Sequence, residues 1–333
     1  MLRSRRTALA AALSVLLPAL AVGCGQGAQQ PARKAPAAAP GRFFSPRSFW
    51  NRPLATNTPL ASGSAGLVSE LRRLLAATNP WIDTWNFSTP IYRVGQHQRR
   101  VRVRLDRRYD PLAKAFRSVP LPASARPAPG NDRHLVVFQP STETIWEFFK
   151  LRRVGRRWHA AWGGKMRHVS RAKGVFADPY GATATGLPLV GGLIRAGELR
   201  RGRIDHALAI SLPHTRARAF ASPATRTDGD VYSPTAIPEG TRFRLDPSLD
   251  LSKLGLPRVT LIIAEAVQRY GMIVRDKGGA VTFYAESAKH GRRSPYKQLF
   301  GGRSPTDLLS RFPWARLQVV RARLIPRWHA GSS

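Results

Sequence analysis

Apolar and basic residues alternate along Val101-Arg102-Val103-Arg104-Leu105, and Tyr92-Arg93-Val94 carries the same pattern. Successive side chains of a β-strand point to opposite faces, so this alternation predicts strands with one buried and one solvated face. Other short apolar runs predict further strands at 134–138, 144–151, 157–162, 204–212, 241–245 and 317–324. The chain is therefore predicted to be mainly β with a few helices, folded as a single-domain β-sandwich or jelly roll.

Helical patterns are fewer. Leucines recur at helical spacing in Ala65–Ala77, and Pro257–Tyr270 predicts a second amphipathic helix. Residues 272–275 and 280–285 predict a β-hairpin around Lys277-Gly278-Gly279. The glycine-studded stretch 181–192 is expected to be a loop.

The N-terminus has the pattern of an export signal. Arginines within residues 1–6 precede the apolar run Ala8–Val22, which ends at Gly23-Cys24. Leu20-Ala21-Val22-Gly23-Cys24 resembles a bacterial lipobox, and this resemblance implies that Cys24, the only cysteine, carries the lipid. The protein is then expected to be lipid-anchored at the outer face of the cytoplasmic membrane or the cell surface; a plain signal would make it secreted.

These features predict the organisation of the chain. A lipoprotein signal peptide is expected at 1–23, a flexible tether at 24–42, one β-rich domain at 43–326 and a tail at 327–333. Ser4-Arg5-Arg6 also resembles a twin-arginine export motif, which leaves the export route open.

The charge predicts an anionic partner. The chain has 54 Lys and Arg against 19 Asp and Glu, a formal net charge of +35. Such a protein is attracted to anionic polymers, and for an outward-facing lipoprotein we expect acidic polysaccharide or cell-wall polymer. Nucleic acid is the less favoured partner because no nucleic-acid motif accompanies the charge.

Common cofactor motifs are absent from the sequence. Its eight histidines lack zinc-site spacing, and no P-loop, dinucleotide fingerprint or G-x-S-x-G elbow occurs. Asp228-Gly229-Asp230 is acidic but too short for an EF-hand loop. We therefore expect no cofactor and no metal.

Glu147 is the first candidate catalytic residue. In the expected strand Ile145-Trp146-Glu147-Phe148-Phe149, Trp146 and Phe148 share one face while Glu147 lies on the other with Ile145 and Phe149. A carboxyl group on an apolar face has a raised pKa and could act as the acid or base of glycoside chemistry. Alternatively, Glu147 pairs with one of the many arginines.

His206 is the second candidate, because a strand over Ile204–Leu212 would place it on an apolar face where it could shuttle protons. A core histidine that donates to a carbonyl is the alternative. Asp276 and Tyr270 are the third and fourth, since they flank the expected hairpin and could face a groove. Gly271 between them suits the end of a helix.

Several motifs together resemble an uncharacterised family of secreted bacterial proteins, often linked to sugar-binding modules. The matching motifs are Ser48-Phe49-Trp50-Asn51-Arg52-Pro53, Trp146-Glu147, Ala184–Arg195 with its Gly-Leu-Pro, His206-Ala207-Leu208, Thr241–Leu245 and Arg269–Asp276 with its Tyr-Gly-Met. The resemblance implies a single domain in polysaccharide surroundings. It also implies that Thr183 and Ala209 replace an Asp and an Arg usual in the family.

These residues leave two classes of function open. An enzyme acting on an anionic polysaccharide would be a glycoside hydrolase, with Glu147 and Asp276 or Asp205 as its carboxylates, or a lyase. The lyase would use Tyr270 or His206 as base.

Substrate would be bound by the arginines and by aromatic and amide side chains: Arg203, Arg244, Trp146, Trp50 and Asn51. A non-catalytic envelope lipoprotein is the other class. Convergence of Glu147, His206 and Asp276 on one deep groove would favour the enzyme. A flat arginine face, with these three residues scattered, would favour the binder.

Overall fold

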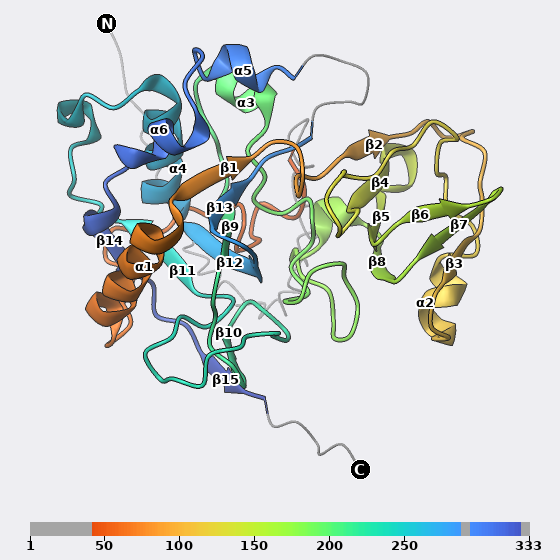
Figure 1. The fold of residues 1–333 in the computed structure, drawn as a ribbon, viewed down its shortest axis with the longest axis horizontal. Helices are drawn as coiled ribbons and strands as arrows, with labels where there is room; N and C mark the ends of the chain where they lie inside the picture. Colours follow the sequence, from red (N-terminus) through yellow and green to blue (C-terminus); the bar gives the residue numbers. More distant parts are fainter. Residues whose placement is uncertain (1–41, 288–293, 328–333) are drawn as a thin grey trace, which may run out of the picture. The chain divides into compact units, whose positions relative to one another are not determined.

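The computed structural model describes residues 42–287 and 294–327 (Figure 1). The expected signal peptide, Cys24 and nearly all of the tether and the tail lie outside these residues. Within them, no helix has the length and apolar character needed to cross a membrane.

The largest sheet in the described part of the chain has six strands (Figure 1). In spatial order they are β1 (Pro80–Asp83), β13 (Val281–Tyr284), β9 (Leu208–Leu212), β12 (Met272–Lys277), β11 (Arg242–Leu245) and β14 (Leu317–Val319). Strand β9 lies between β12, to which it is parallel, and β13, to which it is antiparallel. The predicted hairpin is therefore wrong, because β12 and β13 each pair with β9 and not with each other.

Helices pack against this sheet. Contacts join α1 (Ser64–Thr78) to β14, α4 (Arg258–Tyr270) to β11, and α6 (Pro305–Ser310) to β1. Leu71 and Leu74 of α1 and Ile263 of α4 share one core with Phe243 and Phe283 of the sheet. The two predicted amphipathic helices are thus confirmed, since leucine and isoleucine at helical spacing find an apolar sheet face to cover. The short helices α3 (Ala196–Arg201) and α5 (Tyr296–Leu299) contact each other.

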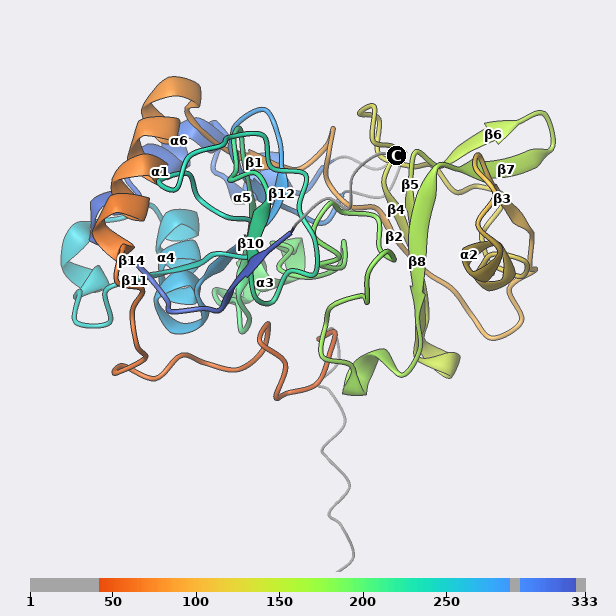
Figure 2. The same cartoon turned by 90° about the horizontal axis from the view of Figure 1, so that it is seen from below.

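A second group of strands follows between residues 91 and 166. Its larger sheet consists of β2 (Ile91–Arg93), β4 (Leu135–Gln139), β5 (Thr144–Phe149) and β8 (Trp162–Met166). Its smaller sheet consists of β3 (Val103–Leu105), β7 (Arg157–Ala160) and β6 (Arg152–Val154), and α2 (Asp110–Ala115) contacts both sheets (Figure 2). The antiparallel β4–β5 pair, joined by η1 (Pro140–Thr142), confirms the predicted strand pair.

Strand β5 is buried on both faces, which explains its lack of polar alternation. Trp146 and Phe148 belong to the core of the second strand group. Ile145 belongs to a different core, which includes Ala209 of β9 and Ile273 of β12. The two larger sheets therefore bury facing residues in a common core, and the prediction of a mainly β fold with a few helices is confirmed.

The remaining elements are short. They are the pair β10 (Ala219–Ala221) and β15 (Leu324–Pro326), and the 3₁₀ turns η2 (Val169–Arg171), η3 (Leu251–Leu254) and η4 (Trp314–Arg316). One boundary matters for function: β9 begins at Leu208, so the prediction that His206 lies on a strand face is wrong. The preceding chain bonds elsewhere, and the Ala207 N–H donates to the carbonyl of Trp50 at 2.7 Å.

Candidate functional site

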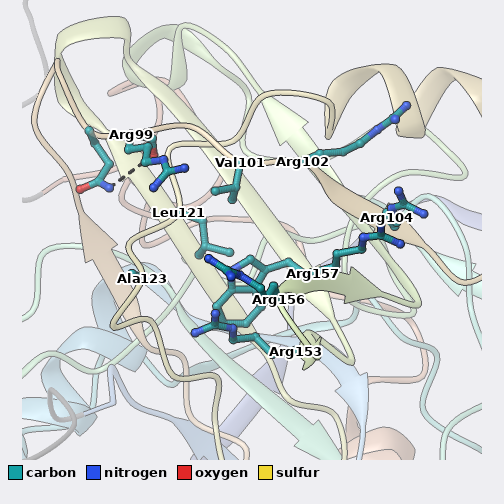
Figure 3. A pocket seen from close by; sticks show the side chains of 11 residues that line it. Arg99, Val101, Arg102, Arg104, Leu121, Ala123, Arg153, Arg156 and Arg157 are labelled. Atoms are coloured by element: carbon teal, nitrogen blue, oxygen red, sulfur yellow. Dashed lines mark hydrogen bonds between the residues drawn. The ribbon is translucent and has the colours of Figure 1, made fainter.

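The smaller sheet carries a groove of about 450 Å³ whose charged lining is entirely arginine. We call it the arginine groove and define it by six side chains: Arg99, Arg102, Arg104, Arg153, Arg156 and Arg157 (Figure 3). All six are exposed. Val101 and Leu121 add apolar surface between them.

Local strand pairing brings these arginines together. Arg102 and Arg104 belong to the alternating stretch, and β3 pairs in parallel with β7. The β6–β7 hairpin supplies the rest, because Arg153 lies opposite Trp158 and the chain turns through Gly155 at φ +58°. Trp158 is buried beneath the groove, and the Arg153 guanidinium lies 5.6 Å from the centroid of its ring. Arginines distant in sequence thus surround one aromatic residue.

The positive charge of the groove is not neutralised from within. Among the described residues, none of the six arginines forms an ion pair. By contrast Arg152, next to Arg153, pairs with Asp106 at 2.8 Å. Exposed, unpaired guanidinium groups are available to carboxylate or phosphate groups of a ligand.

A second pocket, of about 390 Å³, is lined by acidic and basic groups together. We call it the acidic pocket; its ionisable and aromatic lining includes Asp132, His134, Trp162, Asp228, Asp276 and Lys277. Asp276, predicted from sequence, is the one candidate catalytic residue that lines it. Glu147 and His206 do not.

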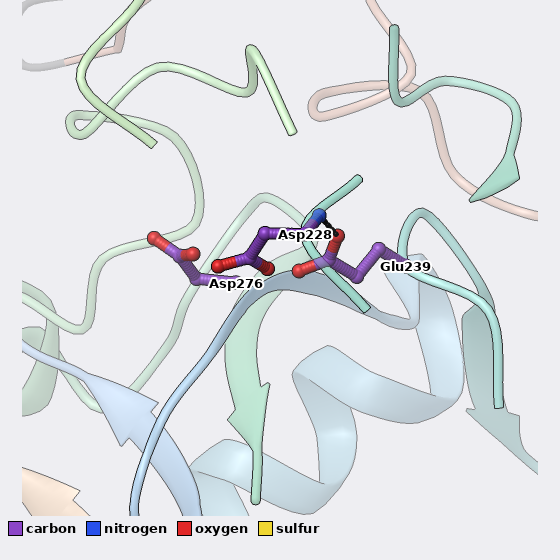
Figure 4. A group of neighbouring side chains, drawn as sticks. All are labelled: Asp228, Glu239 and Asp276. Atoms are coloured by element: carbon purple, nitrogen blue, oxygen red, sulfur yellow. Dashed lines mark hydrogen bonds between the residues drawn. The ribbon is translucent and has the colours of Figure 1, made fainter. Parts of the chain in front are cut away.

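Three carboxylates cluster at this pocket. Asp228, Glu239 and Asp276 each place an oxygen within 4.8 Å of the other two, and Figure 4 shows the carboxylate of Asp228 between its neighbours. Glu239 is completely buried. Its Oε2 accepts a hydrogen bond from the Asp228 N–H at 3.2 Å, whereas its Oε1 has no hydrogen-bond partner in the described part of the chain.

The backbone holds this cluster in place. The pairing of β12 with β9 shifts register between Val274 and Asp276, a bulge that changes the direction of the following side chain. Gly240, which follows Glu239, has φ +84°, and a Cβ there would lie 1.8 Å from the carbonyl oxygen of Ala221. The Gly240 N–H donates to the Val274 carbonyl at 2.8 Å, so the Glu239 segment is tied to β12.

Burial changes the proton affinities of these groups. Burial raises the pKa of Asp276 to about 7, and Asp228 adds to the rise. Burial, followed by the charge of Asp276, also raises the pKa of Glu239 well above its usual range. Burial lowers the pKa of His134 to about 3, so its ring is neutral at pH 7. Neither ring nitrogen of His134 has a hydrogen-bond partner among the described residues.

Glu147 fastens a loop to β5. Its Oε1 accepts from the Ala182 N–H at 2.7 Å and its Oε2 from the Leu189 N–H at 2.9 Å, and the side chain is fully buried. Burial raises its pKa to about 7. The two alternatives drawn from the sequence were a catalytic carboxyl group and an ion pair with arginine. The contacts show neither of them, because both oxygens accept hydrogen bonds from the glycine-studded loop.

One small cavity is lined by residues from two distant motifs, namely Trp50 and Asn51 from the first and His206 from the second. The cavity between them is only about 10 Å³, no larger than one water requires. His206 Nε2 lies 3.1 Å from a carboxylate oxygen of Glu198. The Trp50 indole N–H donates to the Gly174 carbonyl at 2.8 Å. These contacts give His206 and Trp50 a structural role. The catalytic role of His206 and the substrate-binding role of Trp50 and Asn51 stay predictions.

The other predicted residues are dispersed. Tyr270 and Trp146 are buried in different cores. Arg203 is exposed and paired with Asp205 at 2.9 Å. Arg244 is 4% exposed and donates to two backbone carbonyls, at 2.8 and 3.0 Å. Neither arginine lines either pocket.

Sequence reasoning missed most of the acidic pocket. Asp132, His134 and Glu239 belong to no motif, and Asp228 was recognised only as part of an acidic tripeptide. Pro238-Glu239-Gly240 offered one signal, because proline and glycine so close together indicate a turn with a constrained backbone. Comparison of the chain with protein-family models, with curated proteins and with solved structures finds no match.

Proposed function

We propose that this protein binds an anionic polymer of the cell envelope, through the arginine groove. The observation that carries the proposal is the set of six exposed arginines around Trp158, none of them in an ion pair in the described part of the chain. An envelope glycopolymer repeats its phosphate or carboxylate groups, so it can contact several arginines at once. The proposal further assigns the protein to the outer cell surface, as the lipobox resemblance implies.

The positions of the candidate catalytic residues support binding over catalysis. Glu147 contacts backbone amides, His206 contacts Glu198, and Asp276 lines the acidic pocket. These three residues do not meet in one groove, and none of them lines the arginine groove, which favours a binder over an enzyme.

Binding is tested with the soluble chain, from Gly25 onward, and purified teichoic acid, polygalacturonate and neutral dextran. The variant replaces Arg153, Arg156 and Arg157 with Gln. We expect the variant to lose about 10- to 100-fold in affinity for the two anionic polymers at low salt, since each exposed charge contact contributes a fraction of a kcal/mol to about 1 kcal/mol. The dependence of affinity on salt should also weaken by about two to three ions.

The matched control removes the same charge elsewhere. Arg72, Arg311 and Arg321 are exposed, and their replacement by Gln lowers the net charge equally without touching the groove. Equal losses in both triple variants would show that net charge alone drives association, which contradicts the proposal. Tighter binding to DNA than to teichoic acid and polygalacturonate would also contradict it.

Cleavage of the same polymer is a second candidate function. One observation favours it: Asp132 and Asp276 line a pocket that also has an aromatic wall, Trp162, on which a sugar ring could stack. Two carboxylates beside a stacking surface form the basic equipment of glycoside cleavage.

The assay for cleavage follows reducing ends and the absorbance of unsaturated uronates. New reducing ends that vanish in Asp132→Asn would support a hydrolase, and parallel absorbance would indicate a lyase. Turnover unchanged by Asp132→Asn would exclude this pocket.

A further inference from the structure

The three-carboxylate cluster has no internal counter-charge. No member of Asp228, Glu239 and Asp276 forms an ion pair within the described residues. The nearby cationic groups are engaged elsewhere: Lys277 lies 3.5 Å from Asp230, and Arg226 donates to backbone carbonyls. In a protein of net charge +35, these three carboxyl groups therefore lie together without a direct cationic partner among the described residues.

Arg275 is the remaining cation near the cluster, and its side chain is directed away. Its Nη1 donates to the carbonyls of Leu189 and Gly191 at 2.9 and 3.3 Å, and its guanidinium carbon lies 3.8 Å from the centroid of the Tyr284 ring. Arg275 thus contributes to the local field without a direct contact to any of the three carboxylates.

Glu239 supplies an independent indication of a ligand. Its side chain is 0% exposed, and its Oε1 lacks a hydrogen-bond partner among the described residues. The carboxylate points towards Asp228, so the unpartnered oxygen faces the cluster (Figure 4). A buried carboxylate oxygen without a donor among the described residues is costly, and a bound cation would remove this cost.

We infer that Asp228, Glu239 and Asp276 bind a hard divalent cation, and that the cation is calcium. Their oxygens lie within 4.8 Å of one another, a separation compatible with ligation of one ion by three carboxylates. An all-oxygen ligand set selects calcium, magnesium or manganese over zinc or copper. Calcium takes six to eight oxygens in flexible geometry, so water from the acidic pocket can complete its shell.

The inference stands independently of the proposed polymer binding, because the two sites share no residue. The proposed site differs from the expectation of a metal-free protein drawn from the sequence, which stays a prediction. Its ligands come from β12, from the residue before Gly240 and from the loop that precedes it, so they form no linear motif.

Calcium binding is tested directly by titration calorimetry. The soluble chain is treated with chelator, desalted, and titrated with CaCl₂ to about 10 mM, which covers even weak extracellular sites. We expect one saturable site and a rise in Tm on addition of calcium. Terbium is a useful probe besides, because Trp162 lines the pocket and can sensitise its luminescence.

Asp228→Asn is the principal variant, since Asp228 is exposed and its side chain can change without loss of the fold. It should weaken calcium affinity about tenfold or more, because fewer charged ligands weaken a calcium site. Glu239→Gln should abolish both the calorimetric signal and the terbium luminescence. The matched control is Glu265→Gln, on the exposed face of α4, which should bind as the parent chain does.

Two outcomes would overturn the inference. One is a chain that shows no saturable binding up to 10 mM calcium. The other is a signal that persists undiminished in Asp228→Asn and Glu239→Gln, since the ion would then lie elsewhere. Tighter binding of MgCl₂ than of CaCl₂ would overturn the assignment to calcium.

Discussion

Replacement of Glu147 by Gln should lower the free energy of unfolding at low pH and should also remove a large part of its dependence on pH. Both carboxylate oxygens of Glu147 accept backbone N–H groups, from Ala182 and Leu189. Gln offers one acceptor oxygen, so one of the two buried amides faces an NH₂ group and loses its acceptor. A buried donor left unsatisfied costs roughly 1–3 kcal/mol of unfolding free energy.

The pH dependence of stability, by contrast, favours the variant at high pH. Burial raises the pKa of Glu147 from 4.5 to about 7. Between these values the folded protein holds a proton that the unfolded chain has released, so the free energy of unfolding falls as the pH rises through this window. The shift corresponds to roughly 3 kcal/mol, lost in full above pH 7. The variant cannot titrate and does not lose it.

Urea unfolding of both proteins at pH 5 and pH 8 measures this difference. We expect Glu147→Gln to be less stable than the parent chain at pH 5, and to equal or exceed it at pH 8. Other titrating groups cancel because they are common to both proteins. Glu265→Gln, an exposed substitution of the same kind, should show no such crossing.

A stability difference that stays constant within about 1 kcal/mol from pH 5 to pH 8 would refute the reasoning, since a shift of this size corresponds to less than one pKa unit. It would mean that Glu147 is ionised in the folded protein throughout, held by its amide donors against the cost of burial.

Three further changes probe other contacts, each measured by denaturant unfolding. Burial raises the pKa of Glu198, but His206 and Arg195 together bring it down to about 2. Roughly 3 kcal/mol of stability should therefore be present above pH 4.5, be lost as the pH falls towards 2, and be absent in Glu198→Gln. Gly192→Ala should cost roughly 3 kcal/mol, because φ is +70° and the new Cβ would lie 2.3 Å from the backbone nitrogen of Ala209. Trp50→Phe should cost about 2–3 kcal/mol, because it removes the 2.8 Å hydrogen bond of the indole N–H and leaves a void. An unchanged midpoint of denaturant unfolding in Gly192→Ala or Trp50→Phe would contradict these contacts.

Local patterns in the sequence predicted local structure well. The period of the leucines in α1 and of the arginines in β3 follows directly from backbone geometry, so those elements were predictable. The position of β9 between β12 and β13 was not predictable. A short Gly-Gly connection fits a hairpin, but it also fits two strands that lie on either side of a third. Residues 204–207 look like strand, yet Ala207 bonds to Trp50 instead.

The candidate sites likewise contain residues that the sequence pattern predicts and contacts that only the tertiary structure creates. Arg102 and Arg104 were visible as a basic strand face, but their meeting with Arg153 depends on the pairing of β3, β7 and β6. Glu239 and Asp276 belong to segments joined by backbone hydrogen bonds from Gly240 to Val274 and from Val274 to Thr241. Proximity of this kind arises from tertiary structure, and the spacing of single residues carries no trace of it.

The central place of β9 also determines when the fold can form. Its Leu-Ala-Ile-Ser-Leu sequence is buried throughout, and both strands that cover its edges lie much later in the chain, with β13 ending at Tyr284. A nascent chain therefore exposes an apolar strand with two open edges until the ribosome has passed β13, a state prone to aggregation. Products truncated before β12 should consequently be insoluble fragments instead of smaller folded domains.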